Sequence, residues 1–336
     1  MGAIESVAVT VIGGFLGAGK TTLVNHLLRA SPGRRLAVLV NDFGSVDIDG
    51  KLVVGVDGDM VSLAGGCICC SIRDDLAQAL HRLVALREKP EHILVEASGV
   101  SDPAAIARAI ADPVLSSVLR LDAVAVVVDA EAHLQLRTRE RIVANGQLKA
   151  ADLVVLSKID LVDDEGRRRV EALVRKAVPK ARVLPAERGG VAPELLLGLR
   201  RTDPIPPADM HVHMGDAAAP DRHAEFVTWS WVGDAPLSSR RLRRAIDALP
   251  PTLFRAKGIV HLAREPTRRG VLHVVGRRAE LELGEAWGDA PRRSELVFIG
   301  APGSIDPVAL DESLRACERD PNEGSSVTRW MRRLVD

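Results

Sequence analysis

A glycine-rich stretch near the start of the chain constrains the fold more than any other feature. Residues 13–22 read GGFLGAGKTT, follow the apolar run 7–12 and precede a helical pattern that begins at Leu23. From Gly14 the stretch completes G-x-x-x-x-G-K-[ST], which between a strand and a helix is typical of a phosphate-binding P-loop. The sequence therefore predicts an α/β domain with a mainly parallel sheet.

The residue types of this stretch suit phosphate binding. Gly14, Gly17, Ala18 and Gly19 are small, so the backbone N–H groups can turn toward phosphates at the positive end of the following helix. Lys20 is expected to reach the β- and γ-phosphates, and Thr21 to offer its hydroxyl to Mg²⁺. The alternative, a glycine-rich turn without a ligand, is disfavoured because strand, complete motif and helix occur together.

Length and charge limit the remaining classes. A chain of 336 residues favours two domains, and equal totals of 45 basic and 45 acidic residues give no general attraction to nucleic acid or anionic lipid. The basic cluster 238–244 is interpreted as the polar face of a helix, with Leu242 among its apolar positions. No apolar run approaches the ~20 residues of a membrane span, and the N-terminus lacks a secretory leader pattern. We therefore expect a cytoplasmic protein that binds neither nucleic acid nor membrane.

Three of the four cysteines form a C-x-C-C motif, Cys67, Cys69 and Cys70. Thiols this close rarely form an unstrained disulfide, whereas three thiolates on one loop can hold a soft or borderline metal ion. A fourth position would stay open for water, for an acceptor's ligand or for a carboxylate such as Asp42 or Asp47. The alternatives are buried structural cysteines or a redox switch. The fourth cysteine, at position 317, stands alone and is expected in a core.

Acidic residues follow two further predicted strands. The segment 41–50 comes after the run 35–40 and contains Asp42, Asp47 and Asp49, so we interpret it as a switch loop, with a plain polar turn as the alternative. Glu96 lies at the end of the predicted strand 92–97 and is expected to be the second magnesium anchor. Lys20, Thr21 and Glu96 are thus the candidate catalytic residues.

A tetrapeptide at the end of a later strand indicates guanine. Ser157, Lys158 and Asp160 belong to the sequence SKID, which is similar to the N-K-x-D motif of GTPases. Asp160 could accept hydrogen bonds from guanine N1–H and the exocyclic amine, and Lys158 would lie along the base. Ser157 stands where asparagine is commoner, so an accidental match is the alternative.

The composition changes after residue 202. Residues 203–223 are rich in proline, alanine and aspartate and are interpreted as a linker between a domain 1–202 and a domain 224–336. His211, His213 and His223 are either an auxiliary metal site or solvated side chains. Beyond them, strand and helix patterns predict a smaller α+β domain with an antiparallel sheet.

With these motifs in view, the chain resembles the CobW-type metallochaperone GTPases over essentially its whole length. The similarity is carried by five segments: GGFLGAGKTT (13–22), NDFGSVDID (41–49), GGCICCSIRDDL (65–76), VEASGVSDP (95–103) and SKID (157–160). The resemblance implies that GTP and Mg²⁺ bind at Gly17, Gly19, Lys20, Thr21 and Thr22. It also implies that Zn²⁺, or a similar ion such as Co²⁺, binds at the C-x-C-C motif, and that GTP hydrolysis controls delivery to a client metalloprotein.

Two other classes stay open on the sequence alone. One is a P-loop ATPase or small-molecule kinase whose cysteines form a redox switch. The other is a GTP-binding scaffold with slow turnover, because no general base or arginine finger can be assigned. The physiological metal and the client are likewise open, and a homo-oligomer is compatible with the sequence.

Overall fold

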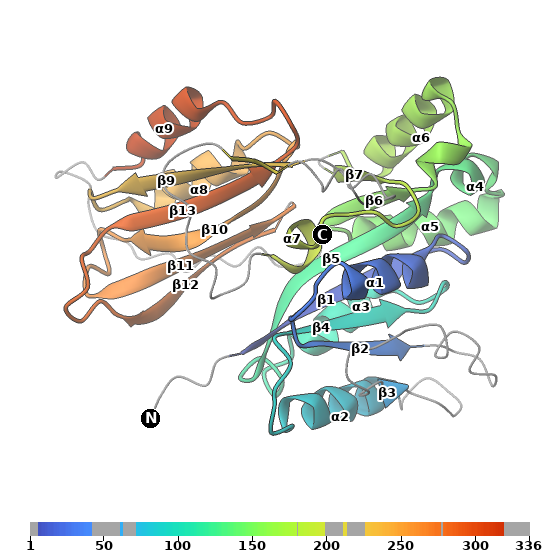
Figure 1. Ribbon diagram of the computed structural model, residues 1–336, viewed down its shortest axis with the longest axis horizontal. Coiled ribbons are helices and arrows are strands. Elements are labelled where there is room, and N and C mark those ends of the chain that lie inside the picture. Colours follow the sequence, from blue (N-terminus) through green and yellow to red (C-terminus); the bar gives the residue numbers. More distant parts are fainter. Residues whose placement is uncertain are drawn as a thin grey trace. The chain divides into compact units, whose positions relative to one another are not determined.

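The computed structural model describes residues 6–41, 61–62, 72–179, 181–198, 211–213, 226–276 and 278–318 (Figure 1). The chain divides into two compact units. The first unit comprises residues 1–197 with 219–224, and the second comprises residues 198–218 with 225–336. The predicted domain boundaries at 202 and 224 lie outside the described residues and stay a prediction.

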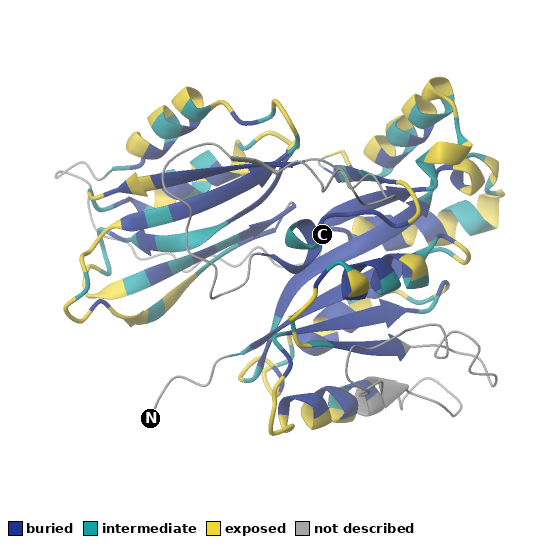
Figure 2. Cartoon of the chain, viewed as in Figure 1, coloured by how far each residue is buried: buried dark blue, intermediate teal, exposed yellow. Residues whose placement is uncertain are grey.

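The first unit contains a seven-stranded sheet in the order β3-β2-β4-β1-β5-β6-β7, in which every neighbouring pair is parallel. Its strands are β1 (Val7–Gly14), β2 (Leu36–Asn41), β3 (Val61–Ser62), β4 (His92–Ala97), β5 (Leu119–Asp129), β6 (Leu153–Ser157) and β7 (Arg182–Ala186). The central strands β1 and β4 are buried along their whole length, as their apolar sequences predict (Figure 2). The predicted parallel α/β fold is confirmed.

Helices cover both faces of this sheet. They are α1 (Lys20–Arg29), α2 (Ile72–Val84), α3 (Pro103–Ile110), α4 (Ala130–Gln135), α5 (Thr138–Lys149), α6 (Asp164–Ala177) and α7 (Pro193–Leu197), with a short 3₁₀ helix η1 (Ile159–Leu161). Side chains alternate between faces along β1. On one face Thr10 Oγ1 donates to the carbonyl of Leu196 in α7 at 3.0 Å. On the other, Gly13 lies against α3, because a Cβ there would stand 2.4 Å from the Pro103 ring.

The parallel arrangement determines where the functional residues gather. Because all strands run the same way, their carboxyl ends lie along one edge of the sheet. The P-loop follows β1 at this edge, Glu96 lies near the end of β4, Asp129 ends β5, and Ser157 ends β6. Residues far apart in the sequence are thereby brought into one row.

The second unit is built on a six-stranded antiparallel sheet in the order β12-β11-β10-β13-β9-β8. Its elements are β8 (His211–His213), β9 (Phe226–Gly233), α8 (Ser239–Asp247), β10 (Leu253–His261), β11 (Arg268–Val275), β12 (Arg278–Ala286), β13 (Ser294–Gly300) and α9 (Pro307–Arg315). The predicted α+β class is confirmed. The short strand β8 was not expected, since residues 203–223 show no periodicity; it pairs with the edge of β9.

The helices of the second unit pack on this sheet through apolar side chains. Leu242 and Ile246 of α8 are buried in one core with Trp229 and Trp231 of β9. The Trp231 Nε1–H also donates to Asp311 of α9 at 2.9 Å. On the polar side of α8, Arg243 pairs with Asp247 at 2.8 Å, as expected of a solvated helix face.

Cys317 is buried in the apolar core of the second unit, as expected, and burial raises the pKa of its thiol to about 11. Among the helices that the structure describes, none combines the length and the apolar character needed to cross a membrane.

Candidate nucleotide site

The predicted P-loop connects β1 to α1. Gly14, Gly17 and Gly19 have φ angles of 141°, 71° and 96°, a region that residues with a Cβ rarely adopt. At Gly14 there is also no room for a side chain, because a Cβ would stand 2.4 Å from the carbonyl oxygen of Val127. The sequence GGFLGAGKTT therefore uses glycine where the backbone demands it. The loop ends where Gly19 precedes the first residue of α1, Lys20.

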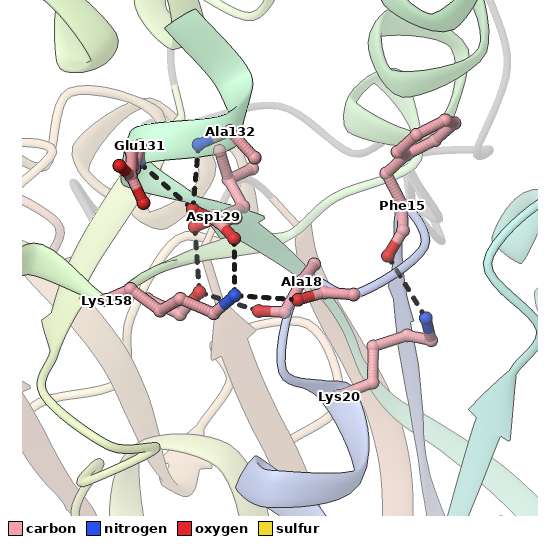
Figure 3. A network of polar contacts seen from close by, with 10 residues as sticks. Phe15, Ala18, Lys20, Asp129, Glu131, Ala132 and Lys158 are labelled. Carbon is pink, nitrogen blue, oxygen red and sulfur yellow. Dashed lines mark hydrogen bonds and ion pairs between the residues drawn. The ribbon is translucent and has the colours of Figure 1, made fainter. Parts of the chain in front are cut away.

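Two predicted magnesium anchors meet beside the P-loop. The Thr21 Oγ1–H donates to Glu96 Oε1 at 2.7 Å, although the two residues are 75 positions apart. They meet because β4 lies next to β1 in the sheet. Lys20 is buried, and its Nζ donates to the Phe15 carbonyl oxygen at 3.2 Å (Figure 3). A hydroxyl and a carboxylate this close fit Mg²⁺, which prefers a few oxygen ligands together with substrate phosphates.

The SKID motif contacts the P-loop directly. The Ser157 hydroxyl donates to the carbonyl oxygen of Ala18 at 2.6 Å. Lys158 has a left-handed backbone, with φ of 55°, and its Nζ donates to the carbonyl oxygen of Gly17 at 3.0 Å. Ser157 thus has a hydrogen-bonding role of its own at the position where asparagine is commoner. Asp160 is exposed at the same edge, in η1.

One residue of this site was not predicted from the sequence. Asp129 ends β5, and its Oδ2 pairs with Lys158 Nζ at 2.6 Å (Figure 3). Its Oδ1 accepts from the backbone N–H groups of Glu131 and Ala132 at 3.0 and 2.9 Å and so caps α4. The sequence did contain a signal for Asp129, because an acidic residue at the carboxyl end of an apolar strand is the same pattern that identified Glu96.

A small cavity of about 20 Å³ lies behind the P-loop, between β5, α4 and α5. Its lining includes Leu16, Asp129, His133 and Gln147. His133 is buried, and burial lowers the pKa of its imidazole; the charge of Arg141 lowers it further, while that of Asp129 raises it. The neutral imidazole is therefore the favoured form at neutral pH.

Several predicted metal-binding residues lie outside the described part of the chain. These are Asp42, Asp47, Asp49, Cys67, Cys69, Cys70 and His223; for His211 and His213 only the backbone of β8 is described. Among described residues, no group of three or more His, Cys, Asp or Glu side chains is arranged to hold a metal ion. The described neighbours of the C-x-C-C motif are β3, which ends at Ser62, and α2, which begins at Ile72.

Family models match both parts of the chain. Residues 8–185 match the CobW/HypB/UreG nucleotide-binding domain, and residues 226–318 match the cobalamin synthesis protein CobW C-terminal domain. The zinc chaperone CobW of Sinorhizobium sp is 30% identical over 346 residues, which cover 92% of this chain and 97% of that protein.

Two further proteins are similar along most of the chain. The zinc-regulated GTPase metalloprotein activator 1 of Dictyostelium discoideum is 26% identical over 383 residues, covering 93% of this chain and 80% of that protein. The crystal structure of the Zn(II)-bound YjiA GTPase from E. coli has 22% identity and a TM-score of 0.44, with 94% of this chain and 100% of that chain covered. From the family models and the identity to its relatives, the chain belongs to the CobW family of P-loop GTPases.

Proposed function

We propose that this GTPase is a cytoplasmic metallochaperone that binds Zn²⁺ through Cys67, Cys69 and Cys70 and delivers it to a client metalloprotein under control of the bound nucleotide. Three thiolates with one open coordination position suit a site that passes its metal on. The names of relatives, which include a zinc chaperone and a zinc-regulated activator, support the same cargo. Co²⁺ is the second ion that such a site would accept.

The observation that carries the nucleotide part of the proposal is the 2.7 Å contact between Thr21 and Glu96. It supports a magnesium site next to the P-loop, where bound Mg²⁺ would offset the negative charge of the β- and γ-phosphates. Lys20 would exchange its carbonyl partner for a phosphate oxygen, a stronger charge-assisted contact. The remaining phosphate contacts fall to the P-loop backbone, namely to Gly14, Gly17, Ala18, Gly19 and Thr22.

The strand order gives the bound nucleotide a direction. Asp160, the proposed guanine contact, follows β6, on one side of β1, whereas Glu96 lies on β4, on the other side. With the base at β6 and the phosphates in the P-loop after β1, the terminal phosphate points toward β4, β2 and β3. The two segments that carry Asp42 and the C-x-C-C motif leave from β2 and β3. The γ-phosphate, which GTP has and GDP lacks, would therefore lie on the side of the sheet from which the segment with the C-x-C-C motif starts.

This arrangement supports the control step. We propose that GTP favours zinc binding or docking to the client and that hydrolysis loosens the thiolate site. The catalytic contribution of the described residues is positional and electrostatic: Lys20, Thr21 and Glu96 hold the phosphates and the magnesium ion while water attacks the γ-phosphate.

The test is a zinc titration against a chromophoric chelator, with Mg²⁺ and either a nonhydrolysable GTP analogue or GDP. For the wild type we expect zinc affinities that differ about tenfold between the two nucleotides, within the usual range of coupling between sites. The Cys67→Ser, Cys69→Ser, Cys70→Ser triple variant should lose tight zinc binding and still bind GTP. Lys20→Ala should keep zinc binding and lose the nucleotide dependence.

Cys317→Ser is the matched control, because it removes a buried thiol of the second unit and should leave zinc affinity unchanged. Equal zinc affinity with both nucleotides, together with unchanged transfer to an acceptor, would refute nucleotide control. Zinc binding that survives the triple substitution would refute the cysteine site.

A further inference from the structure

We infer that Gln147 of α5 is a positioning residue for GTP: it holds the loop that follows β4 in place for the γ-phosphate, and it thereby sets the preference for GTP over GDP. This inference rests on the proposed nucleotide site.

Gln147 spans both ends of a three-residue segment of that loop. Its side chain is buried, and its Nε2 donates to the carbonyl oxygens of Gly99 at 3.1 Å and Ser101 at 2.9 Å. The amide orientation is fixed by this pair, because a flipped amide would set Oε1 against two carbonyl oxygens. Both N–H donors of one side chain are thus committed to the backbone of the loop.

The P-loop holds the same segment from another side. A Cβ at Gly99 would stand 2.5 Å from Cδ2 of Leu16 and 2.8 Å from its Cα, so the two backbones are in close contact. Leu16 is itself 62% exposed and is therefore not fixed by a surrounding core. Gly99 lies between the P-loop and the amide of α5, and its backbone position follows from both contacts.

Gly99 offers a hydrogen-bond donor where the γ-phosphate is expected. It follows β4, on the side of the P-loop toward which the terminal phosphate points. It is buried, yet its backbone N–H donates to no group within the described part of the chain. Because buried N–H groups seldom lack an acceptor, a phosphate oxygen is a suitable partner for this one.

The physical consequence concerns GTP and not GDP. A donor held in place before the ligand arrives costs no reorganisation when the phosphate binds. If the two Gln147 hydrogen bonds are lost, the loop must be ordered by the ligand, and this cost falls only on a nucleotide that has a γ-phosphate. GDP, which ends at the β-phosphate, would be bound by the P-loop as before.

The test compares Gln147→Met with the wild type. Methionine keeps the length and flexibility of the side chain but removes both donors. We expect the affinity for a nonhydrolysable GTP analogue to fall about tenfold and kcat for GTP to fall, with GDP affinity changed less than about twofold. The matched control is Gln135→Met, at the exposed end of α4, which should change none of these values.

Gln147→Asn is the second variant, because it keeps the donors but withdraws them by one methylene group. It should shift the GTP to GDP affinity ratio in the same direction and covers the case in which Gln147→Met fails to fold. A parallel loss of GTP and GDP affinity would reduce Gln147 to a structural role and overturn the inference, as would an unchanged ratio.

The wild type and Lys20→Ala separate this inference from the proposed site. If Lys20→Ala binds GTP as tightly as the wild type does, the proposed nucleotide site is wrong. If GTP binding depends on Lys20 but both Gln147 variants keep the wild-type affinity ratio, only the role of Gln147 is wrong.

Discussion

Two glycines of the P-loop should respond very differently to the same substitution. Gly17 has φ of 71° and nothing within 4 Å of the position that a Cβ would take, so Gly17→Ala meets only the cost of a left-handed backbone, about 1 kcal/mol. Gly14 has φ of 141°, and a Cβ there would stand 2.4 Å from the Val127 carbonyl oxygen. Strain and overpacking together make Gly14→Ala cost about 4 kcal/mol.

The assay uses the distribution of chromophores. All four tryptophans come after residue 224, whereas α1 to α7 belong to the first unit. Urea unfolding followed by far-UV circular dichroism should therefore show a large shift for Gly14→Ala and a small one for Gly17→Ala. Tryptophan fluorescence should report an unchanged second unit in both variants. Equal shifts for the two variants would refute the claim that contact with β5, and not backbone angle alone, fixes Gly14.

Two further predictions concern residues around the P-loop. Asp129→Ala should destabilise the first unit by about 2 kcal/mol, because α4 loses its cap and Lys158 loses its ion-pair partner. Asp129→Asn keeps the cap and should cost about 1 kcal/mol or less, since Lys158 is 39% exposed. The free energy of unfolding measures both, and equal costs would exclude a contribution from the cap. The pKa of His133 in the folded state lies below the unfolded value of 6.5, so the unfolded chain binds the proton first as the pH falls. The free energy of unfolding therefore decreases as the pH falls below 6.5 toward the folded pKa. His133→Asn should make the loss between about pH 7.5 and 5.5 smaller, with His81→Asn as the exposed control; an identical pH dependence in wild type and His133→Asn would contradict this.

The local features of this protein were determined by its sequence. The P-loop motif, the buried strands and the SKID tetrapeptide are contiguous, and the conformations they need are set by residue types within a few positions. The apolar run before Gly14 and the helical pattern after Lys20 therefore predict β1 and α1 without knowledge of any distant residue. The same reasoning identified Glu96 as an acidic residue at a strand end, and the α+β class of the second unit.

Tertiary structure decided which of these features meet. Thr21 contacts Glu96 because β4 lies between β2 and β1, an order that hydrophobic periodicity does not specify. Lys158 reaches the carbonyl of Gly17 across 141 positions, and Gln147 reaches that of Gly99 across 48. These contacts depend on strand order and helix packing, which arise from burial of the whole sheet and not from any one segment. Lys158, whose predicted place along the base stays a prediction, thus also supports the P-loop, and Gln147, which belongs to no motif, contacts the loop after β4.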